Sequence, residues 1–404
     1  MNRVLPNRPS LRGAAPSRPR QIKDHVRATR APLLASLGPA LAIALALLAS
    51  GGTARAEDNA LSVPAGGAAL SAIGAPPPSP PPVPLGIFAD NNLPEGRFVV
   101  SITPVFTGLS GILIGTRGVS NEFLVSTVPF FLNPRQKVRV VPQHIDIATQ
   151  ILRVRYGVTD NFEMILDTGW VEKDLHALVF KGTAGTTALG DNYPRTSSLV
   201  DTILTGVYRV YQDDVHRIQL SLAFSFPTGI DDATFNNFLL PNGARLNKRA
   251  FYGMELGTGT FDVLPGVIYA GYLGSWSWGL SYRGRLPLDY NPQGYRWGNL
   301  HEFNGWAGYT WVPGLTTTFR VCGTTQNHID GFDPLINSPA VPSNPLFYGG
   351  QRVELFGGGS IDGKLIGVDN ALILIEAGAP VYQNLNGPQI KKNWQAAARV
   401  AFKF

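Results

Sequence analysis

Charged side chains alternate with apolar ones through much of this 404-residue chain, and they carry both signs. If the apolar neighbours face one way, these charges must face the other. Mixed charges on one face can line a narrow polar path, or they can pair with one another and fill it. There is no single-sign ring, so we expect no strong anion or cation selectivity. The set comprises the acids Glu163, Asp167, Asp201, Asp262, Glu302, Glu354 and Glu376, and the bases Arg209, Arg217, Arg283, Arg285, Arg320, Arg352, Arg399 and Lys403.

Seven of these residues are our candidates for a solute path. Arg283 and Arg285 are expected to face Asp262 and Glu302 across neighbouring strands, if the alternation holds. The full candidate set is Asp262, Arg283, Arg285, Glu302, Arg320, Glu163 and Asp201.

Catalytic and metal-binding patterns are weak by comparison. A serine nucleophile needs a histidine within reach and a third orienting group, but there is no G-x-S-x-G motif, and Gly357–Ser360 has no evident partner. The single Cys322 leaves no zinc cluster to propose. Asp330, Asp333 and Asn337 are too few for calcium. We therefore predict no enzyme activity and no cofactor; a hydrolase remains the alternative, with His144, His176, His216, His301 and His328 as candidate bases.

The elements that carry these charges read as strands. In Arg217–Phe226, apolar residues occupy every second position and mostly polar ones the positions between, and Trp276–Leu286 repeats the pattern. This period of two is typical of strands with two different faces. It recurs from about residue 97 to the C-terminus.

The connections fall into two alternating length classes. Short ones are expected near 159–161, 212–216, 274–275, 312–314 and 362–367, and long ones near 108–142, 172–198, 229–256, 289–298, 326–350 and 381–392. Six long and five short connections join twelve strands. An even number of strands of about 10 residues, with short periplasmic turns and long outer loops, is the plan of a transmembrane barrel. We predict an all-β fold, an antiparallel barrel of about 12 strands.

One stretch departs from the alternation. Ile145, Ile147 and Ile151 share a parity with Arg153 and Arg155. We infer either a bulge near Ile151 or a strand that rises above the bilayer.

The C-terminus supports the same fold. Phe402 and Phe404 face one way and Lys403 the other, and a last strand that ends in Phe resembles the signal recognised by the outer-membrane barrel-assembly machinery. That machinery and outer-membrane lipid are therefore predicted partners. Aromatic residues near strand ends suit the membrane interface: Trp170, Trp276, Trp278, Tyr282, Tyr309, Trp311 and Trp394.

The first 95 residues have a different composition. Residues 1–56 hold nine of the 34 basic residues and one of the 28 acids, contain an apolar stretch and end in Ala54-Arg55-Ala56, so we predict a signal peptide. An uncleaved anchor is the alternative. The remaining chain has a charge near −2 and no basic run, which argues against nucleic-acid binding. Residues 57–95 are Ala- and Pro-rich and are predicted to be a periplasmic linker, with the barrel over 96–404.

Five segments also resemble a known family: 156–163 (YGVTDNFE), 226–229 (FPTG), 256–266 (LGTGTFDVLPG), 275–278 (SWSW) and 294–298 (GYRWG) with Glu302. In this order they resemble the outer-membrane family named for the meta-pathway of phenol degradation, over about residues 97–404. The resemblance implies a transporter in the outer membrane of a Gram-negative bacterium. We predict passive passage of small, uncharged or aromatic molecules; a closed structural or partner-binding barrel is the alternative.

Overall fold

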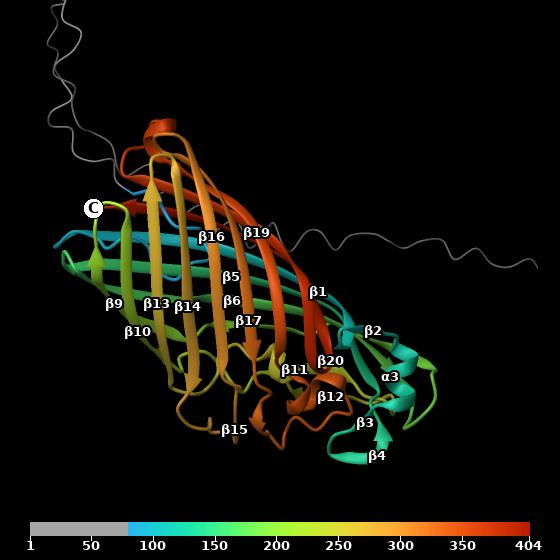
Figure 1. Ribbon diagram of the computed structural model, residues 1–404. Coiled ribbons are helices and arrows are strands. Elements are labelled where there is room, and N and C mark those ends of the chain that lie inside the picture. The colour runs from blue at the N-terminus through green and yellow to red at the C-terminus, as the bar shows by residue number, and fades with distance from the viewer. Residues whose placement is uncertain (1–79) are drawn as a thin grey trace, which may run out of the picture.

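The computed structural model describes residues 80–404, whose main feature is a closed ring of antiparallel strands (Figure 1). The ring closes because β1 pairs with β20 on one side and with β5 on the other. The predicted signal peptide and residues 57–79 lie outside the described residues. The ring elements are β1 (Phe98–Gly115), β5 (Val140–Thr159), β6 (Phe162–Phe180), β9 (Thr202–Gln212), β10 (His216–Phe226), β13 (Asp262–Leu273), β14 (Trp276–Pro287), β16 (Leu300–Val312), β17 (Leu315–Gln326), β19 (Gly350–Asp362) and β20 (Ala371–Lys403).

The element β20 fills two places in the ring, because it folds back on itself. Its first half pairs with β19 and its second half with β1, and Leu385 faces both Gly350 and Gly115. The two ends of β20 are adjacent, since the Lys403 N–H donates to the Asn370 carbonyl at 2.9 Å. The eleven elements therefore supply twelve strands, as predicted. The prediction of a long loop at 381–392 is wrong, because the chain reverses tightly after Leu385.

The seam between the first and last strands is also as predicted. The register runs from Val99 opposite Lys403 to Thr107 opposite Gln395. Phe98 and Phe404 exchange backbone hydrogen bonds of 3.3 and 2.9 Å. Their rings stack at 4.8 Å.

The barrel wall is polar inside and apolar outside. In β10, Leu220, Leu222 and Phe224 point outward with 45–49% exposure, whereas the alternate residues Ala223 and Ser225 are fully buried. Burial here marks the lumen side, and exposed apolar side chains mark the surface that lipid covers. Trp170, Trp276, Trp311 and Trp394 are likewise exposed on the outside. No helix among residues 80–404 is long and apolar enough to cross a bilayer.

The long connections gather at one end of the barrel and form what we call the cap (residues 116–139, 181–201, 227–261, 288–299 and 327–349). Its core is apolar and includes Leu124, Phe235, Phe238, Phe251 and Ile329, each no more than 1% exposed. The short turns and η4 (Gly363–Ile366) lie at the opposite end. The cap elements are β2 (Arg117–Val119), α3 (Asn121–Thr127), β3 (Pro129–Phe130), β4 (Asn133–Lys137), β7 (Ala188–Asn192), β8 (Arg195–Leu199), β11 (Thr234–Leu239), β12 (Arg245–Arg249), η1 (Tyr252–Met254), β15 (Tyr295–Arg296), β18 (Asp330–Gly331), η2 (Val341–Ser343) and η3 (Pro345–Phe347).

The irregular stretch in β5 has a simple origin. Its pairing with β1 continues without a shift from Tyr156 to His144, so the bulge near Ile151 is wrong. The strand is 20 residues long and continues into the cap. Ile145 and Ile147 face inward there and pack against the cap core. They therefore face the same side as the inward arginines, because the inner face of the barrel becomes apolar at this height.

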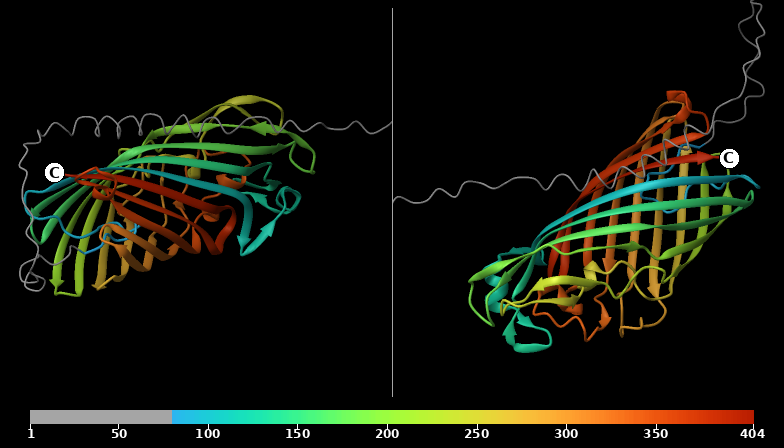
Figure 2. Two further views of the ribbon diagram at one scale, coloured as in Figure 1. Left: turned by 90° about the horizontal axis from the view of Figure 1, so that it is seen from above. Right: turned by 180° about the vertical axis from the view of Figure 1, so that it is seen from behind.

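The end of the predicted linker lies inside the barrel, not outside it. Residues 80–95, which we call the inner segment, enter the lumen, and the blue start of the described chain is seen there in Figure 2. Val83, Ile87 and Phe88 are buried against inward side chains of the wall, including Trp306. The Gln219 amide donates to the Asp90 carbonyl at 2.9 Å. The prediction for 80–95 is therefore corrected: apolar side chains within this proline-rich stretch bind it to the lumen.

Candidate functional site

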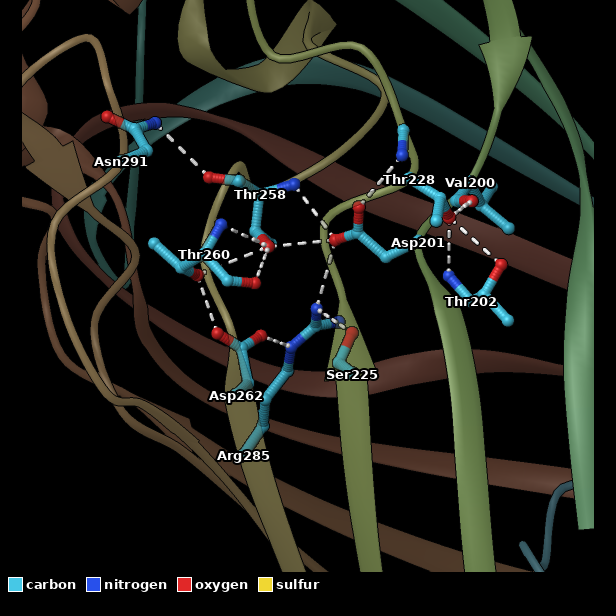
Figure 3. Close-up of polar contacts among 11 residues, drawn as sticks. Val200, Asp201, Thr202, Ser225, Thr228, Thr258, Thr260, Asp262, Arg285 and Asn291 are labelled. Carbon is cyan, nitrogen blue, oxygen red and sulfur yellow. Dashed lines mark hydrogen bonds and ion pairs between the residues drawn. The ribbon is translucent and has the colours of Figure 1, made fainter.

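The first group of lumen charges centres on Arg285 of β14 (Figure 3). Its Nε donates to Asp262 of β13 at 2.5 Å, and its Nη2 donates to Asp201 at 3.3 Å and to the Ser225 hydroxyl at 3.1 Å. The Asp262 side chain is fully buried. The predicted contact of Arg285 with Asp262 is confirmed, and Asp201 joins them from a position 84 residues earlier in the chain.

The same carboxylates anchor the chain where the cap meets the wall. Asp201 accepts from the Thr258 N–H at 2.9 Å, from its hydroxyl at 2.8 Å and from the Gly229 N–H at 3.1 Å. The Thr260 hydroxyl donates to Asp262 at 2.6 Å. A Cβ on Gly257 would lie 2.6 Å from the Gly229 backbone, so the two glycines permit this close crossing. The segments 226–229 and 256–266 therefore cross closely at the junction of the cap and the barrel wall.

A second group lies on β16, β17 and β20, on the side of β14 away from β13. Arg320 of β17 donates to Glu376 at 2.5 Å and to the Asn304 side-chain oxygen at 2.6 Å, and Asn304 in turn donates to Glu302 at 2.9 Å. Arg320 and Glu376 are both almost fully buried. The candidates Glu302 and Arg320 are therefore brought together.

Glu163 has a different role from the one expected. Its carboxylate accepts from Arg155 at 2.8 Å and from the Leu93 N–H at 2.9 Å, while the Arg155 Nη2 donates to the Asn91 carbonyl at 2.6 Å. Glu163 therefore holds the inner segment in place. Two further inward pairs are Arg153 with Asp167 at 2.6 Å and Lys392 with Glu354 at 2.7 Å.

Arg283, the remaining candidate, belongs to none of these ion pairs. It lines a cavity of about 400 Å³ between the inner segment and the wall, which we call the central cavity. Its guanidinium lies 4.9 Å from the ring centroid of Phe88. The cavity is also lined by Arg153, Arg285, Glu302, Glu376 and Arg399, and by the apolar residues Leu85, Ile87, Val105, Ile151, Ile203, Leu264 and Leu300.

A second cavity, the vestibule, was not anticipated. It has a volume of about 240 Å³ and lies between the cap and the inner face of the wall. Ile145 and Ile147 of β5 line it, so their unexpected parity was the sequence signal that could have revealed it. Its aromatic lining is Phe251, Trp297, Phe347 and Tyr348, and its polar lining includes Gln326, Arg352 and Gln389.

One buried acid in the cap bears on pH dependence. Glu255 lies between η1 and β13 and is 4% exposed. Burial raises the pKa of Glu255 to about 8, although the Ala233 N–H, which donates to its carboxylate at 2.9 Å, opposes the shift. The cap therefore contains a carboxyl that is largely protonated at neutral pH.

The candidate catalytic histidines do not meet a serine within residues 80–404. Their ring nitrogens contact Asp146 (His144), Asp191 (His176), Tyr269 (His216), Tyr282 (His301) and the Ile329 carbonyl (His328). The loop acids are bound elsewhere, since Asp330 pairs with Arg296 and Asp333 with Arg249. The described part of the chain contains no group of three potential metal ligands.

Comparisons with known proteins give low similarities. No family model matches the chain, and no curated protein matches it. A COG4313 outer membrane channel from Pseudomonas putida F1 is similar at 12% identity, covering 78% of this chain and 97% of that one, with a TM-score of 0.49. The P. putida toluene transporter TodX shows 10% identity over 77% and 91%, with a TM-score of 0.40. A Pseudomonas aeruginosa FadL homologue shows 8% over 76% and 90%, with a TM-score of 0.36.

Proposed function

We propose that this protein is an outer-membrane channel for passive passage of small molecules, with the cap outside the cell. The observation that carries the proposal is the vestibule, an aromatic-lined cavity at the cap end of a closed, lipid-clad barrel. A pocket of mainly apolar residues with a few polar groups suits small, poorly polar ligands. TodX is a toluene transporter, but its TM-score of 0.40 leaves the solute class of this chain to the cavity itself.

The lumen chemistry supports small solutes over bulk flow. The inner segment and several ion pairs lie inside the lumen, and the central cavity of about 400 Å³ lies beside them. A barrel of this strand number has room for more than side chains but less than a porin. Solutes would pass from the vestibule to the central cavity.

The alternative is a closed structural or partner-binding barrel. It is favoured by the same inner segment, which is buried between Ile165, Val207, Ile268 and Trp306. On this alternative the ion pairs only stabilise the interior.

Flux measurements separate the two. Purified full-length protein in liposomes should admit benzyl alcohol, and Ile147→Trp should reduce this flux because it fills the vestibule. Leu220→Trp, on the outer face, is the matched control and should have no effect. Arg285→Ala should raise flux if that residue borders the path. An absence of flux and of conductance in planar bilayers would support the structural alternative.

Two further expectations stay predictions. No family model matches the chain, so its membership of the meta-pathway family stays a prediction. Recognition of Phe402 and Phe404 by the assembly machinery is proposed from the terminal pattern; the Phe404 side chain is 52% exposed, as such an interaction requires.

A further inference from the structure

Three inward arginines that border the cavities lack an ion pair. Within residues 80–404, no salt bridge to a carboxylate is formed by Arg283, Arg352 or Arg399. By contrast, Arg153, Arg155 and Arg320 each have one, and Arg285 has two. Among the residues that the structure describes, the Arg399 side chain donates only to the Thr103 hydroxyl, at 3.0 Å. Nε and Nη2 of Arg283 and Nε of Arg352 are buried without a hydrogen-bond partner in the described part of the chain.

These arginines are divided between the two cavities. Arg283 and Arg399 line the central cavity. Of its two acids, Glu376 pairs with Arg320, whereas Glu302 accepts from the neutral Asn304 amide and forms no salt bridge among residues 80–404. The lining still holds four arginines against these two acids. The third arginine, Arg352, lines the vestibule, whose lining contains no acid. Both cavities therefore combine apolar walls with an excess of positive charge.

Such an arrangement is costly without a counter-charge. A buried ion that lacks a partner loses its hydration without compensation, so natural interiors pair it. A guanidinium presents a planar fork of donors that matches a carboxylate in a bidentate manner. A carboxylate on the solute would supply the counter-charge that Arg283 and Arg352 lack.

The rest of each lining specifies the body of that solute. Phe251, Trp297, Phe347 and Tyr348 surround the vestibule, and Phe88 lies beside Arg283 in the central cavity. Aromatic rings pack well against one another, with offset or edge-to-face geometry. A cavity of about 150 Å³ can hold benzene, so both cavities have room for a single-ring molecule.

We propose that the transported solutes are small aromatic carboxylates, which bind first at Arg352 in the vestibule and then at Arg283 and Arg399 in the central cavity. This inference rests on the proposed channel function and names its substrate class. It narrows the expected aromatic solutes to those that carry a carboxylate.

The test compares two single-ring probes that differ in charge, benzoate and benzyl alcohol, with full-length protein. Liposome flux and calorimetric binding in detergent should both favour benzoate in the parent protein. Arg283→Gln, Arg399→Gln and Arg352→Gln should each weaken benzoate binding by about tenfold or more, the scale of a lost charge-assisted hydrogen bond. Benzyl alcohol flux should not fall. Arg283→Lys, which keeps the charge, should restore part of the affinity.

The matched control is Arg209→Gln, since Arg209 contacts Asn161 at the short-turn end, away from both cavities. Heat-modifiable migration verifies that each variant is folded. Benzyl alcohol flux without a benzoate preference, or benzoate binding insensitive to all three substitutions, would overturn the inference and leave the channel intact. Flux of neither probe would overturn the channel itself. Equal binding of hexanoate would reject the aromatic part of the proposal.

Discussion

The cap and the barrel wall obey opposite rules of burial. In the cap, Phe235, Phe238 and Phe251 are buried in a shared core, as in a water-soluble domain. In the wall, Leu220, Leu222 and Phe224 are exposed, while polar residues such as Ser225 are buried. The difference follows from the solvent, since lipid solvates apolar side chains and water does not. One chain can follow both rules because the surroundings change along each long strand.

The largest effect should come from the cap core. Phe251→Ala removes a ring packed edge-on against Phe235 and Phe238 and leaves a cavity, which should cost about 3–5 kcal/mol. Protease digestion of intact cells should then cut the cap while heat-modifiable migration of the barrel persists. Leu246→Ala in the same region, at an exposed position, is the control. Loss of the whole barrel would show that cap and wall fold as one unit.

The cap should also respond to pH. The pKa of Glu255 is about 8 in the folded protein against an ordinary 4.5, so the folded cap keeps a proton that the unfolded chain loses. The stabilising contribution is fully present below about pH 4.5 and is lost as the pH rises through about 8. Amide exchange in the cap should therefore accelerate over this window. Glu255→Gln should abolish the response; an unchanged response would assign it to another group.

Where the cap meets the wall, the buried polar network should be more sensitive than the exposed surface of the cap. Thr260→Val keeps the shape but removes the hydroxyl that donates to buried Asp262, and should cost about 1–3 kcal/mol. The temperature at which heat-modifiable migration is lost measures this decrease in stability. Thr234→Val, at an exposed cap position, should be neutral. An equal effect of both substitutions would show that the Thr260–Asp262 hydrogen bond does not stabilise the protein.

The smallest effect is expected on the lipid-facing surface. Leu220→Ala removes apolar contact area, but lipid fills the space, so only the transfer contribution of about 1–2 kcal/mol is lost. The same assay, compared with Phe251→Ala, measures the difference between the two regions. A cost as large as that of Phe251→Ala would mean that the outer face is covered by protein.

The sequence by itself determined the features that depend on local periodicity. Alternation in Arg217–Phe226 assigned the inner and outer faces, loop lengths indicated twelve strands and Phe404 marked the closing strand. It also placed Asp262 near Arg285, because neighbouring strands share a register. The sequence did not predict the reversal within β20, because the polar residues before Pro388 are typical of a long loop.

Only the tertiary structure decided which side chains contact one another inside the lumen. Asp201 joins Arg285 from 84 residues away, and the inner segment reaches Gln219 and Arg155, because ring closure sets these distances. A proline-rich stretch can extend equally well in water or along a polar lumen, so composition alone misplaced residues 80–95. The vestibule likewise forms only where the cap and the wall come together. The sequence could not predict it, because alternation indicates which way a side chain faces but not what lies opposite it.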